Sequence, residues 1–416
     1  MLKISAAFSR VGILAFAAAC PLALGDSPER SGRIENPVIR LDGVTLAPDS
    51  IERSVESLMQ AAKVVGLAIA IINNNEIVYQ RAFGDRDRDK SLAFTETTVT
   101  YAASFTKAMF AYFAMGLVDE GKLNVDRPIV SYCKRSPAEI EKYADLKGDA
   151  RLDRLTPRHL LSHTSGFANF RFLEPDGKLK FHFEPGARYA YSGEGINLLQ
   201  LIVEEIAGAE LGGLMKARVF DARGMARTRT IWDESFESNF ASGHDATGKS
   251  IGYQRRTSTR AAGSAATTLQ DMAIFLRAVM RGDGLTPASK KLMLDPSIRI
   301  RSARQFPTLD ETLTDRDDHI ELSYGLGWGV IKTPHGPAYF KEGHADGFQN
   351  YMIAFEESKT GIVLMSNSDN AESIFQELLA TLIGDTWSPC EWDGYTPYNA
   401  KPEPTKPEPA KPEAKK

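Results

Sequence analysis

The chain has 416 residues, 43% of them hydrophobic, and a formal net charge of −4. This length and composition fit a soluble globular protein with one large core or two lobes, and the charge gives no reason to expect nucleic-acid binding. Three cysteines are too few for a fold framed by disulfides.

The first 25 residues have the pattern of an export signal. Two basic residues precede an apolar run from residue 11 to 24, which ends in a small-x-small cleavage pattern before Asp26. The run is short for a membrane span. A lipoprotein signal cut before Cys20 is the alternative, but the residues before that cysteine match such a signal poorly. We therefore expect an exported protein, periplasmic or secreted.

The next segments predict a helix followed by a hairpin. Residues 26–47 are polar and contain several turn formers, so we expect a loose lead-in. Apolar residues at helical spacing predict a helix over residues 51–62. Two apolar runs, 66–72 and 77–83, are separated by turn residues and predict a β-hairpin.

The segment from residue 101 to 117 predicts a buried amphipathic helix. Ser104 and Lys107 lie near its start, three residues apart, so a hydroxyl and an amine share one helix face. Such a pair can act as a nucleophile and its activating amine. The lysine must be neutral for this, and burial or a second cation would lower its pKa from about 10.4. The alternative is a serine N-cap followed by a solvated lysine.

From residue 104 to about 310 the pattern is mostly helical, with long loops between the segments. The expected helices span 104–121, 137–145, 157–162, 194–208, 211–217 and 268–281. The expected later elements are strands at 324–331, 338–341, 351–355 and 361–365 and a final helix at 371–384. We expect one antiparallel sheet built from both ends of the chain, with a mostly helical part inserted between them.

This pattern predicts one α+β domain over residues 48–392. Its α/β part comprises about residues 48–100 and 318–392, with the first and last helices packed on the sheet, and its helical part comprises about 101–317. Residues 393–416 contain a five-residue repeat of lysine, proline and glutamate with almost no apolar content. We expect a disordered, partly polyproline-II tail there.

Two more segments carry candidate site residues. Tyr191 lies on a turn before a helix, and between two ammonium groups its ionised form would be favoured, so that it could move protons. Lys341 lies on a strand with Gly343 and His344, and could hold an anionic substrate group while keeping Lys107 neutral. Backbone N–H groups of this strand could face a developing oxyanion. The alternatives are a core tyrosine with one hydrogen bond and an exposed Lys–Glu pair on a sheet edge.

Together these motifs resemble those of a known superfamily. SFTK at Ser104, YSG at Tyr191 and KEG at Lys341 are similar to the three motifs of the class C β-lactamase and penicillin-binding-protein superfamily of serine hydrolases. The stretch LTPRHLLSHTSGF from Leu155 also resembles this superfamily, and the similarity extends over about residues 50–385. It implies the β-lactamase/transpeptidase-like fold, an antiparallel sheet flanked by N- and C-terminal helices with an inserted, mostly helical domain.

The resemblance implies a role for each motif. Ser104 would be the acylated nucleophile, and Lys107 and Tyr191 would move its proton. Lys341 would support the site and contact the substrate. The oxyanion hole would use the backbone N–H groups of Ser104 and of His344, the residue after the glycine of the third motif. Such an enzyme requires no metal or organic cofactor.

Two departures from the family pattern bear on the substrate. Gly193 stands where the second motif of β-lactamases has an asparagine whose amide binds the substrate's acyl side chain, and Glu342 replaces the hydroxyl residue of the third motif. Facing the site, Glu342 would repel a carboxylate, whereas on a strand it could instead point away. Both changes weaken the case for efficient β-lactam hydrolysis and leave the acylation chemistry untouched.

Other literal matches have plainer interpretations. Lys359–Gly361 reads KTG and Ser368–Asn370 reads SDN, as in family motifs, but both lie at the wrong place in the succession of strands. We expect a turn between strands for the first and a loop with a helix cap for the second. His159 and His163 have a spacing that zinc ligands can have, but they lack the accompanying glutamate and are expected to be structural.

The sequence therefore predicts an exported serine hydrolase that cleaves an ester or amide bond through an acyl-enzyme on Ser104. Its substrate would be a β-lactam, a D-alanyl peptide or a small ester. The alternative is a non-catalytic protein that recognises cell-wall peptide, although such a protein would need none of the proton-transfer residues. In an oxidising compartment Cys133 and Cys390 could pair, but nothing in the sequence requires it.

Overall fold

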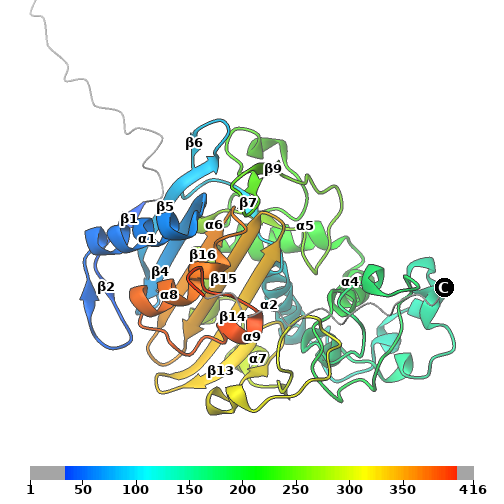
Figure 1. Cartoon of the computed structure of the whole chain (residues 1–416). Coiled ribbons are helices and arrows are strands. Elements are labelled where there is room, and N and C mark those ends of the chain that lie inside the picture. Colours follow the sequence, from blue (N-terminus) through cyan, green and yellow to red (C-terminus); the bar gives the residue numbers. More distant parts are fainter. Residues whose placement is uncertain (1–32, 401–416) are drawn as a thin grey trace, which may run out of the picture. The chain divides into compact units, whose positions relative to one another are not determined.

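The computed structural model describes residues 33–400, so the predicted export signal and residues 401–416 of the predicted tail lie outside the described residues. A large antiparallel sheet with helices on both faces dominates the described part (Figure 1). Its strands are β1 (Ile34–Glu35), β4 (Gly66–Asn73), β5 (Glu76–Asp87), β6 (Leu92–Ala93), β11 (Ile298–Arg299), β12 (Ser323–Tyr324), β13 (Gly329–Thr333), β14 (Gly336–Ala345), β15 (Phe348–Phe355) and β16 (Thr360–Ser366).

The strand order in this sheet is β1-β5-β4-β16-β15-β14-β13-β12-β11, with β6 paired to β5. The early strands meet the late ones where β4 pairs with β16, in a register that places Ile69 opposite Leu364. The predicted sheet built from both ends of the chain is thereby confirmed. The smaller pairs are β2 (Val38–Ile39) with β3 (Thr45–Leu46), β7 (Thr100–Tyr101) with β10 (Ala266–Thr267), and β8 (Gly243–His244) with β9 (Ser250–Gly252).

The helices lie mostly between the early and the late strands in the sequence. The α-helices are α1 (Pro48–Ala62), α2 (Phe105–Asp119), α3 (Pro157–Leu161), α4 (Gly193–Ala207), α5 (Leu211–Met215), α6 (Leu269–Arg281), α7 (Pro287–Leu294), α8 (Glu372–Leu382) and α9 (Cys390–Asp393). The short helices are η2 (Ile129–Tyr132), η3 (Pro137–Glu139), η4 (Glu141–Leu146), η5 (Leu152–Arg154), η6 (Arg171–Leu173), η7 (Lys216–Asp221), η8 (Glu234–Phe236) and η9 (Arg316–Ile320). Among the described residues, none of the helices has both the length and the apolar character needed to cross a membrane.

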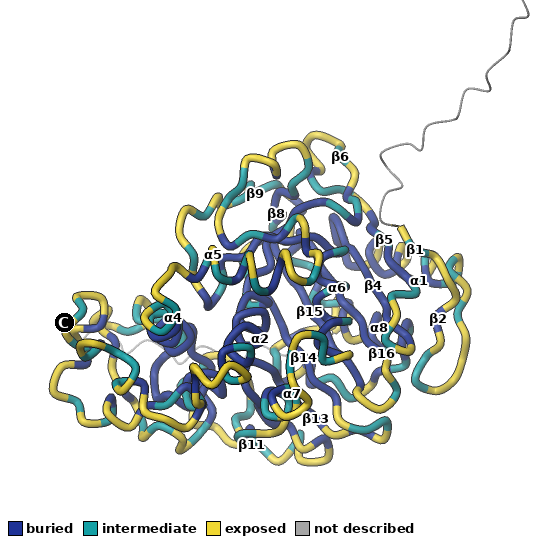
Figure 2. Tube along the Cα trace, turned by 180° about the vertical axis from the view of Figure 1, so that it is seen from behind, coloured by how far each residue is buried: buried dark blue, intermediate teal, exposed yellow. Residues whose placement is uncertain are grey.

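The two faces of the sheet bury different side chains, because successive residues of a strand point to opposite faces. On β4, Ile69 and Ile71 pack in the core with α1 and α8, whereas Ala68 and Ala70 pack in the core with α2 and α6. Figure 1 shows α1 and α8 on one face, and Figure 2 shows α2 and α6 on the other. The small alanines leave room for helices to approach the second face closely, which brings α2 near the sheet.

Helix α2 is buried almost all round, whereas the sequence predicted an amphipathic helix. Of its residues, only Gly116, Val118 and Asp119 are outside the buried class. A helix that is apolar on every side packs inside a core and not on its surface. The sheet covers one side of α2, and residues of α4, α6 and the loops around α3 cover the others in the same hydrophobic cluster.

Several boundaries differ from the predictions. The predicted lead-in is partly regular, because β1 pairs with β5 and extends the sheet. Helix α6, assigned to the helical part, packs directly on strands β4, β5, β15 and β16. The tail was predicted from residue 393, yet Tyr395 is buried and packs against Tyr351 and Phe375. Cys133 and Cys390 are both free thiols, so the described residues contain no disulfide between them.

Candidate active site

Ser104 lies at the junction between β7 and α2. Strand β7 is fixed by its pairing with β10, and Ala103 then takes a left-handed conformation, with φ of 45°, that turns the chain into the helix. Ser104 occupies the N-cap position of α2, but its side chain makes no capping hydrogen bond. Its Oγ lies 3.0 Å from Lys107 Nζ instead. The capping interpretation is therefore wrong for this serine, and the predicted pairing with Lys107 is what the structure contains.

Lys107 is enclosed by the core. Only 1% of the residue is exposed, and Nζ donates a second hydrogen bond, of 2.6 Å, to the carbonyl oxygen of Ala262. Burial lowers the pKa of Lys107 well below its ordinary value, and the positive charge of Lys341 lowers it further, while Glu342 opposes the shift. A neutral amine with a free lone pair can accept the proton of a hydroxyl at this distance.

Tyr191 lies between the two lysines. Lys107 Nζ is 4.7 Å and Lys341 Nζ is 4.9 Å from the centre of its ring, and its hydroxyl accepts a hydrogen bond of 3.1 Å from Lys341. Burial raises the pKa of Tyr191 well above its ordinary value, Glu342 raises it further, and a hydrogen bond with Ser104 acts in the opposite direction. This direction is opposite to the readily ionised tyrosine that the sequence predicted, and it favours the neutral phenol.

Burial is the main cause of the raised pKa of Tyr191, and the carboxylate of Glu342 adds to it. Its Oε1 lies 2.5 Å from Lys341 Nζ, and the two residues are 5% and 0% exposed, respectively. Strand β13 pairs with β14 only as far as Phe340, so Lys341 and Glu342 lie in the part of β14 that pairs with β15. The ion pair cancels much of the field that Lys341 would exert on Tyr191. The expected exposed Lys–Glu pair is thus a buried one.

Lys341 is fully buried, and its side-chain partners, Tyr191 and Glu342, are buried as well. The predicted contact between Lys341 and the substrate stays a prediction, and the contacts in the structure give the lysine a supporting role. The lysine holds the hydroxyl of Tyr191 in place and lowers the pKa of Lys107.

Gly343 and His344 bring β14 up to the nucleophile. A Cβ on Gly343 would lie 2.8 Å from the carbonyl oxygen of Ala102, so only glycine lets the strand run this close to the segment that carries Ser104. His344 lines the cleft, but its ring bonds Glu372 at 2.9 Å, which raises the pKa of the histidine. The histidine is thus poorly suited to act as a base, and the oxyanion role of the N–H groups of Ser104 and His344 stays a prediction.

His159 and His163 have structural roles, as predicted. His159 forms a capping box with Thr156 at the start of α3. The ring of His163 packs 4.2 Å from that of Tyr191, and its Nδ1 accepts the N–H of Ser192 at 3.1 Å. His163 is fully buried, and burial lowers its pKa, so a neutral ring supports the loop that carries Tyr191.

The two misleading motifs also behave as predicted. Lys359 has a φ of 54° in the turn between β15 and β16, and Thr360 begins the second of these strands. Ser368–Asn370 lies in the loop before α8. Within the described residues, no group of histidine, cysteine, aspartate or glutamate side chains is arranged to hold a metal ion.

The cleft beside Ser104 has a volume of about 560 Å³ and polar walls. Its lining residues come from four places: the turn before α2, the segment 142–197, the loop 254–263 and, from the sheet, His344. The basic residues that line it are Lys142, Arg255, Arg256 and Arg260. The predicted site residues did not include these, because a loop gives no periodic pattern. For the three arginines, the run QRRTSTR at 254–260 was the only signal.

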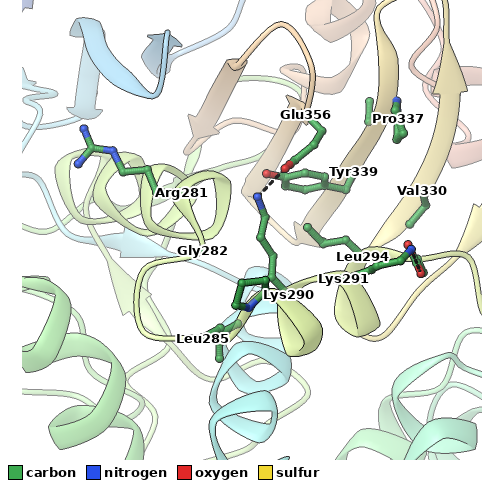
Figure 3. Close-up of a pocket in the computed structure, with 13 residues that line it drawn as sticks. Arg281, Gly282, Leu285, Lys290, Lys291, Leu294, Val330, Pro337, Tyr339 and Glu356 are labelled. Carbon is green, nitrogen blue, oxygen red and sulfur yellow. Dashed lines mark hydrogen bonds and ion pairs between the residues drawn. The ribbon is translucent and has the colours of Figure 1, made fainter. Parts of the chain in front are cut away.

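A second cavity, of about 470 Å³, lies between α6, α7 and the strands β13 and β14. Figure 3 shows Lys290 reaching Glu356 there, beside Tyr339, and the ion pair measures 2.6 Å. None of the predicted site residues lines this cavity. The cleft beside Ser104 is therefore the candidate active site.

Comparisons with known proteins agree with this geometry. The family model described as Beta-lactamase matches residues 51–383. Penicillin-binding protein 4 of Amycolatopsis lactamdurans is 23% identical over 79% of this chain and 88% of its own length. A beta-lactamase of Pseudomonas fluorescens is 25% identical over 68% of this chain and 74% of its own length. Protein flp of Staphylococcus aureus is 24% identical over 76% of this chain and 62% of its own length.

Two solved structures share the fold. The octameric penicillin-binding protein homologue from Pyrococcus abyssi superposes with a TM-score of 0.66 at 22% identity, over 81% of this chain and 77% of that one. The D-alanine carboxypeptidase AmpC from Burkholderia cenocepacia gives 0.63 at 19% identity, over 80% of this chain and 98% of that one. With the family match over most of its length, this chain belongs to the beta-lactamase family of serine hydrolases.

Proposed function

We propose that this protein cleaves an ester or amide bond through an acyl-enzyme on Ser104, outside the cytoplasm. The observation that carries the proposal is the 3.0 Å contact between Ser104 Oγ and Lys107 Nζ. Burial and a second cation lower the pKa of this lysine, which is the condition for an amine to accept a proton near neutral pH.

Acylation follows from these contacts. As Ser104 Oγ attacks the carbonyl carbon, its proton passes to Lys107 Nζ, and the carbonyl oxygen gains the negative charge that backbone N–H groups stabilise. When the intermediate collapses, the neutral phenol of Tyr191 gives its proton to the leaving oxygen or nitrogen. Water then attacks the acyl-enzyme and gives a proton to the phenolate of Tyr191, while the ammonium of Lys107 returns its proton to Ser104 Oγ, 3.0 Å away. Both residues thereby end in their starting states.

The acyl side of the cleft supports an apolar or aromatic group. Gly193 replaces the family's asparagine, and a Cβ at this position would lie 2.4 Å from the ring of Phe170. The aromatic ring therefore fills the space in which the amide would bind a β-lactam side chain. Phe170 stacks on Phe172, with centroids 5.2 Å apart, and Phe172 is 74% exposed at the cleft. This surface favours small esters or apolar peptides over amide-bearing β-lactams.

The test is covalent labelling followed by mass spectrometry. The purified protein is exposed separately to a fluorophosphonate and to a labelled penicillin, and the modified peptide is identified. We expect an adduct on Ser104 that is absent in Ser104→Ala. Ser258→Ala is the matched control, since Ser258 lines the same cleft without a lysine partner among the described residues, and it should be labelled like the unmodified protein.

Labelling with neither probe would overturn the proposal and favour a non-catalytic binding protein. If labelling succeeds, a short-chain nitrophenyl ester compared with a chromogenic cephalosporin separates an esterase from a β-lactamase. We expect the ester to have the larger kcat/KM, because the wall near Gly193 presents an aromatic ring where β-lactamases present an amide.

The proposed export rests on the N-terminal apolar run alone. Its test is the N-terminal sequence of the protein recovered from cells. A mature chain that begins at Asp26 supports secretory cleavage, a lipid-modified Cys20 supports the lipoprotein alternative, and an intact N-terminus in the cytoplasm overturns the export proposal.

A further inference from the structure

The charges that line the cleft beside Ser104 are unbalanced. Arg256, Arg260 and Lys142 all line it, and within the described residues none of the three forms an ion pair. The acid in the wall, Glu194, is already bound, because Arg171 donates to its two oxygens at 3.0 and 2.8 Å. The cleft therefore presents cations without matching anions from the protein.

Arg256 is held in position without being neutralised. Its guanidinium stacks on the ring of Tyr101, 3.5 Å from the centroid, and donates to the carbonyl and side-chain oxygens of Gln254 at 3.1 and 3.3 Å. Neither partner carries a charge. Its neighbour Arg255 differs, because it forms an ion pair of 2.8 Å with Glu237. Of these two adjacent arginines in one loop, Arg255 is thus neutralised by an acid, whereas Arg256 has no acidic partner among the described residues.

Arg260 is close in the chain to the residue that binds Lys107. It precedes by two residues Ala262, whose carbonyl oxygen accepts the hydrogen bond from Lys107 Nζ at 2.6 Å. Two residues span at most about 7 Å, so the backbone of Arg260 lies within that distance of the backbone that holds Lys107. The guanidinium fork of an arginine matches the two oxygens of a carboxylate.

The lysine of the third motif is already engaged, since Lys341 is fully buried and its amine lies 2.5 Å from the carboxylate of Glu342. We infer that the cleft binds a substrate carboxylate through Arg256 and Arg260, in place of the lysine on the strand. The inference rests on the proposed hydrolase function and narrows its substrates to esters or amides that carry a carboxylate near the scissile bond. The same chemistry is available from a peptide C-terminus, a β-lactam acid or a simple dicarboxylic half-ester.

The experiment compares substrates that differ only in this charge. The acyl-side pair is mono-4-nitrophenyl succinate and 4-nitrophenyl butyrate, and the leaving-group pair is 3-carboxyphenyl acetate and phenyl acetate. We expect kcat/KM to favour the anionic member of at least one pair by about tenfold or more, the size of one charge-assisted hydrogen bond pair. In the double variant Arg256→Gln/Arg260→Gln this ratio should fall to near one.

Two controls keep the result interpretable. Arg255→Gln, from the same loop, should preserve the ratio because Glu237 already neutralises that arginine. Arg256→Lys/Arg260→Lys keeps the charge and should retain part of the preference, which a merely structural role of the loop would not explain. Fluorophosphonate labelling of Ser104 in each variant confirms that the nucleophile remains assembled.

The experiment separates failure of the proposed function from failure of the carboxylate inference. No labelling of Ser104 and no hydrolysis of any ester would overturn the proposed function itself. Hydrolysis of the esters with no preference for the anionic member in either pair, or a preference that survives in the double glutamine variant, would overturn the carboxylate inference alone.

Discussion

The buried centre and the open cleft of this protein differ in whether their charged groups have partners within the protein. In the centre, the carboxylate of Glu342 lies 2.5 Å from Lys341, and Lys107 has a lowered pKa. In the cleft, Arg256 and Arg260 have no acidic partner among the described residues. Buried charges are costly unless they are paired or neutralised, whereas exposed ones are solvated at little cost. The proton-transfer groups are therefore matched within the protein, and the groups in the cleft are available to a ligand.

The strongest test of the buried centre is the loss of its amine. Lys107→Met keeps the volume and removes the proton acceptor, so kcat/KM for a nitrophenyl ester should fall by about 10³-fold or more. Steady-state kinetics on the folded variant measure this loss. Lys290→Met, in the cavity of Figure 3, is the matched control and should leave kcat/KM nearly unchanged. Equal activity of both variants would remove Lys107 from the mechanism.

Loss of the phenol should have a smaller effect. Tyr191→Phe keeps the ring between the two lysines and removes the hydroxyl that returns a proton to the leaving group, so kcat should fall by about 10²-fold. An ester with a good leaving group, such as nitrophenolate, should be less affected than an alkyl ester. Tyr189→Phe removes a buried hydroxyl nearby and should change kcat only slightly, and a similar loss in both variants would point to packing.

The third prediction concerns the sign of two pH shifts. The charge of Lys341 lowers the pKa of Lys107 and that of Glu342 raises it. Because the proposed mechanism needs a neutral Lys107, kcat/KM should rise with pH through this pKa. Lys341→Met should therefore move the acidic limb of the pH profile to higher pH, and Glu342→Gln should move it to lower pH. Shifts in the same direction would contradict the assigned electrostatics.

The smallest expected effect is that of salt. Exposed charges are screened at physiological ionic strength, with a Debye length of about 8 Å, whereas buried ones are screened much less. Raising the salt concentration should increase KM for an anionic ester a few-fold and leave kcat for a neutral ester nearly constant. Equal sensitivity of this KM and this kcat to salt would contradict the proposed difference between exposed charges in the cleft and buried charges in the centre.

Local patterns were sufficient to predict much of the fold. The hairpin of β4 and β5, the helix that begins after Ser104 and the late strands all follow from apolar periodicity. The three motifs identified Ser104, Lys107 and Tyr191, which the structure brings together. Pattern reasoning works there because each element is specified by its own residues.

Features that depend on distant contacts were not predictable in this way. Nothing in the letters KEG indicates that the carboxylate of Glu342 contacts the amine of Lys341, because adjacent side chains of a strand ordinarily point to opposite faces. The raised pKa of Tyr191 was not predicted either, because it depends first on how completely the folded chain buries the phenol. Tyr395 lies among polar residues after Trp392, and only the sheet surface beneath it explains why it is buried.

The pairing of β4 with β16 has a consequence for biosynthesis. Until Thr360–Ser366 has been synthesised, the hairpin of β4 and β5 lacks strand β16, which pairs with β4. The sheet that covers one side of α2 is then incomplete. Pairings between such remote segments form slowly, because the intervening chain must first be closed into a loop. The segment that carries Ser104 therefore lacks part of the sheet that supports it until residues 360–366 have been added to the chain.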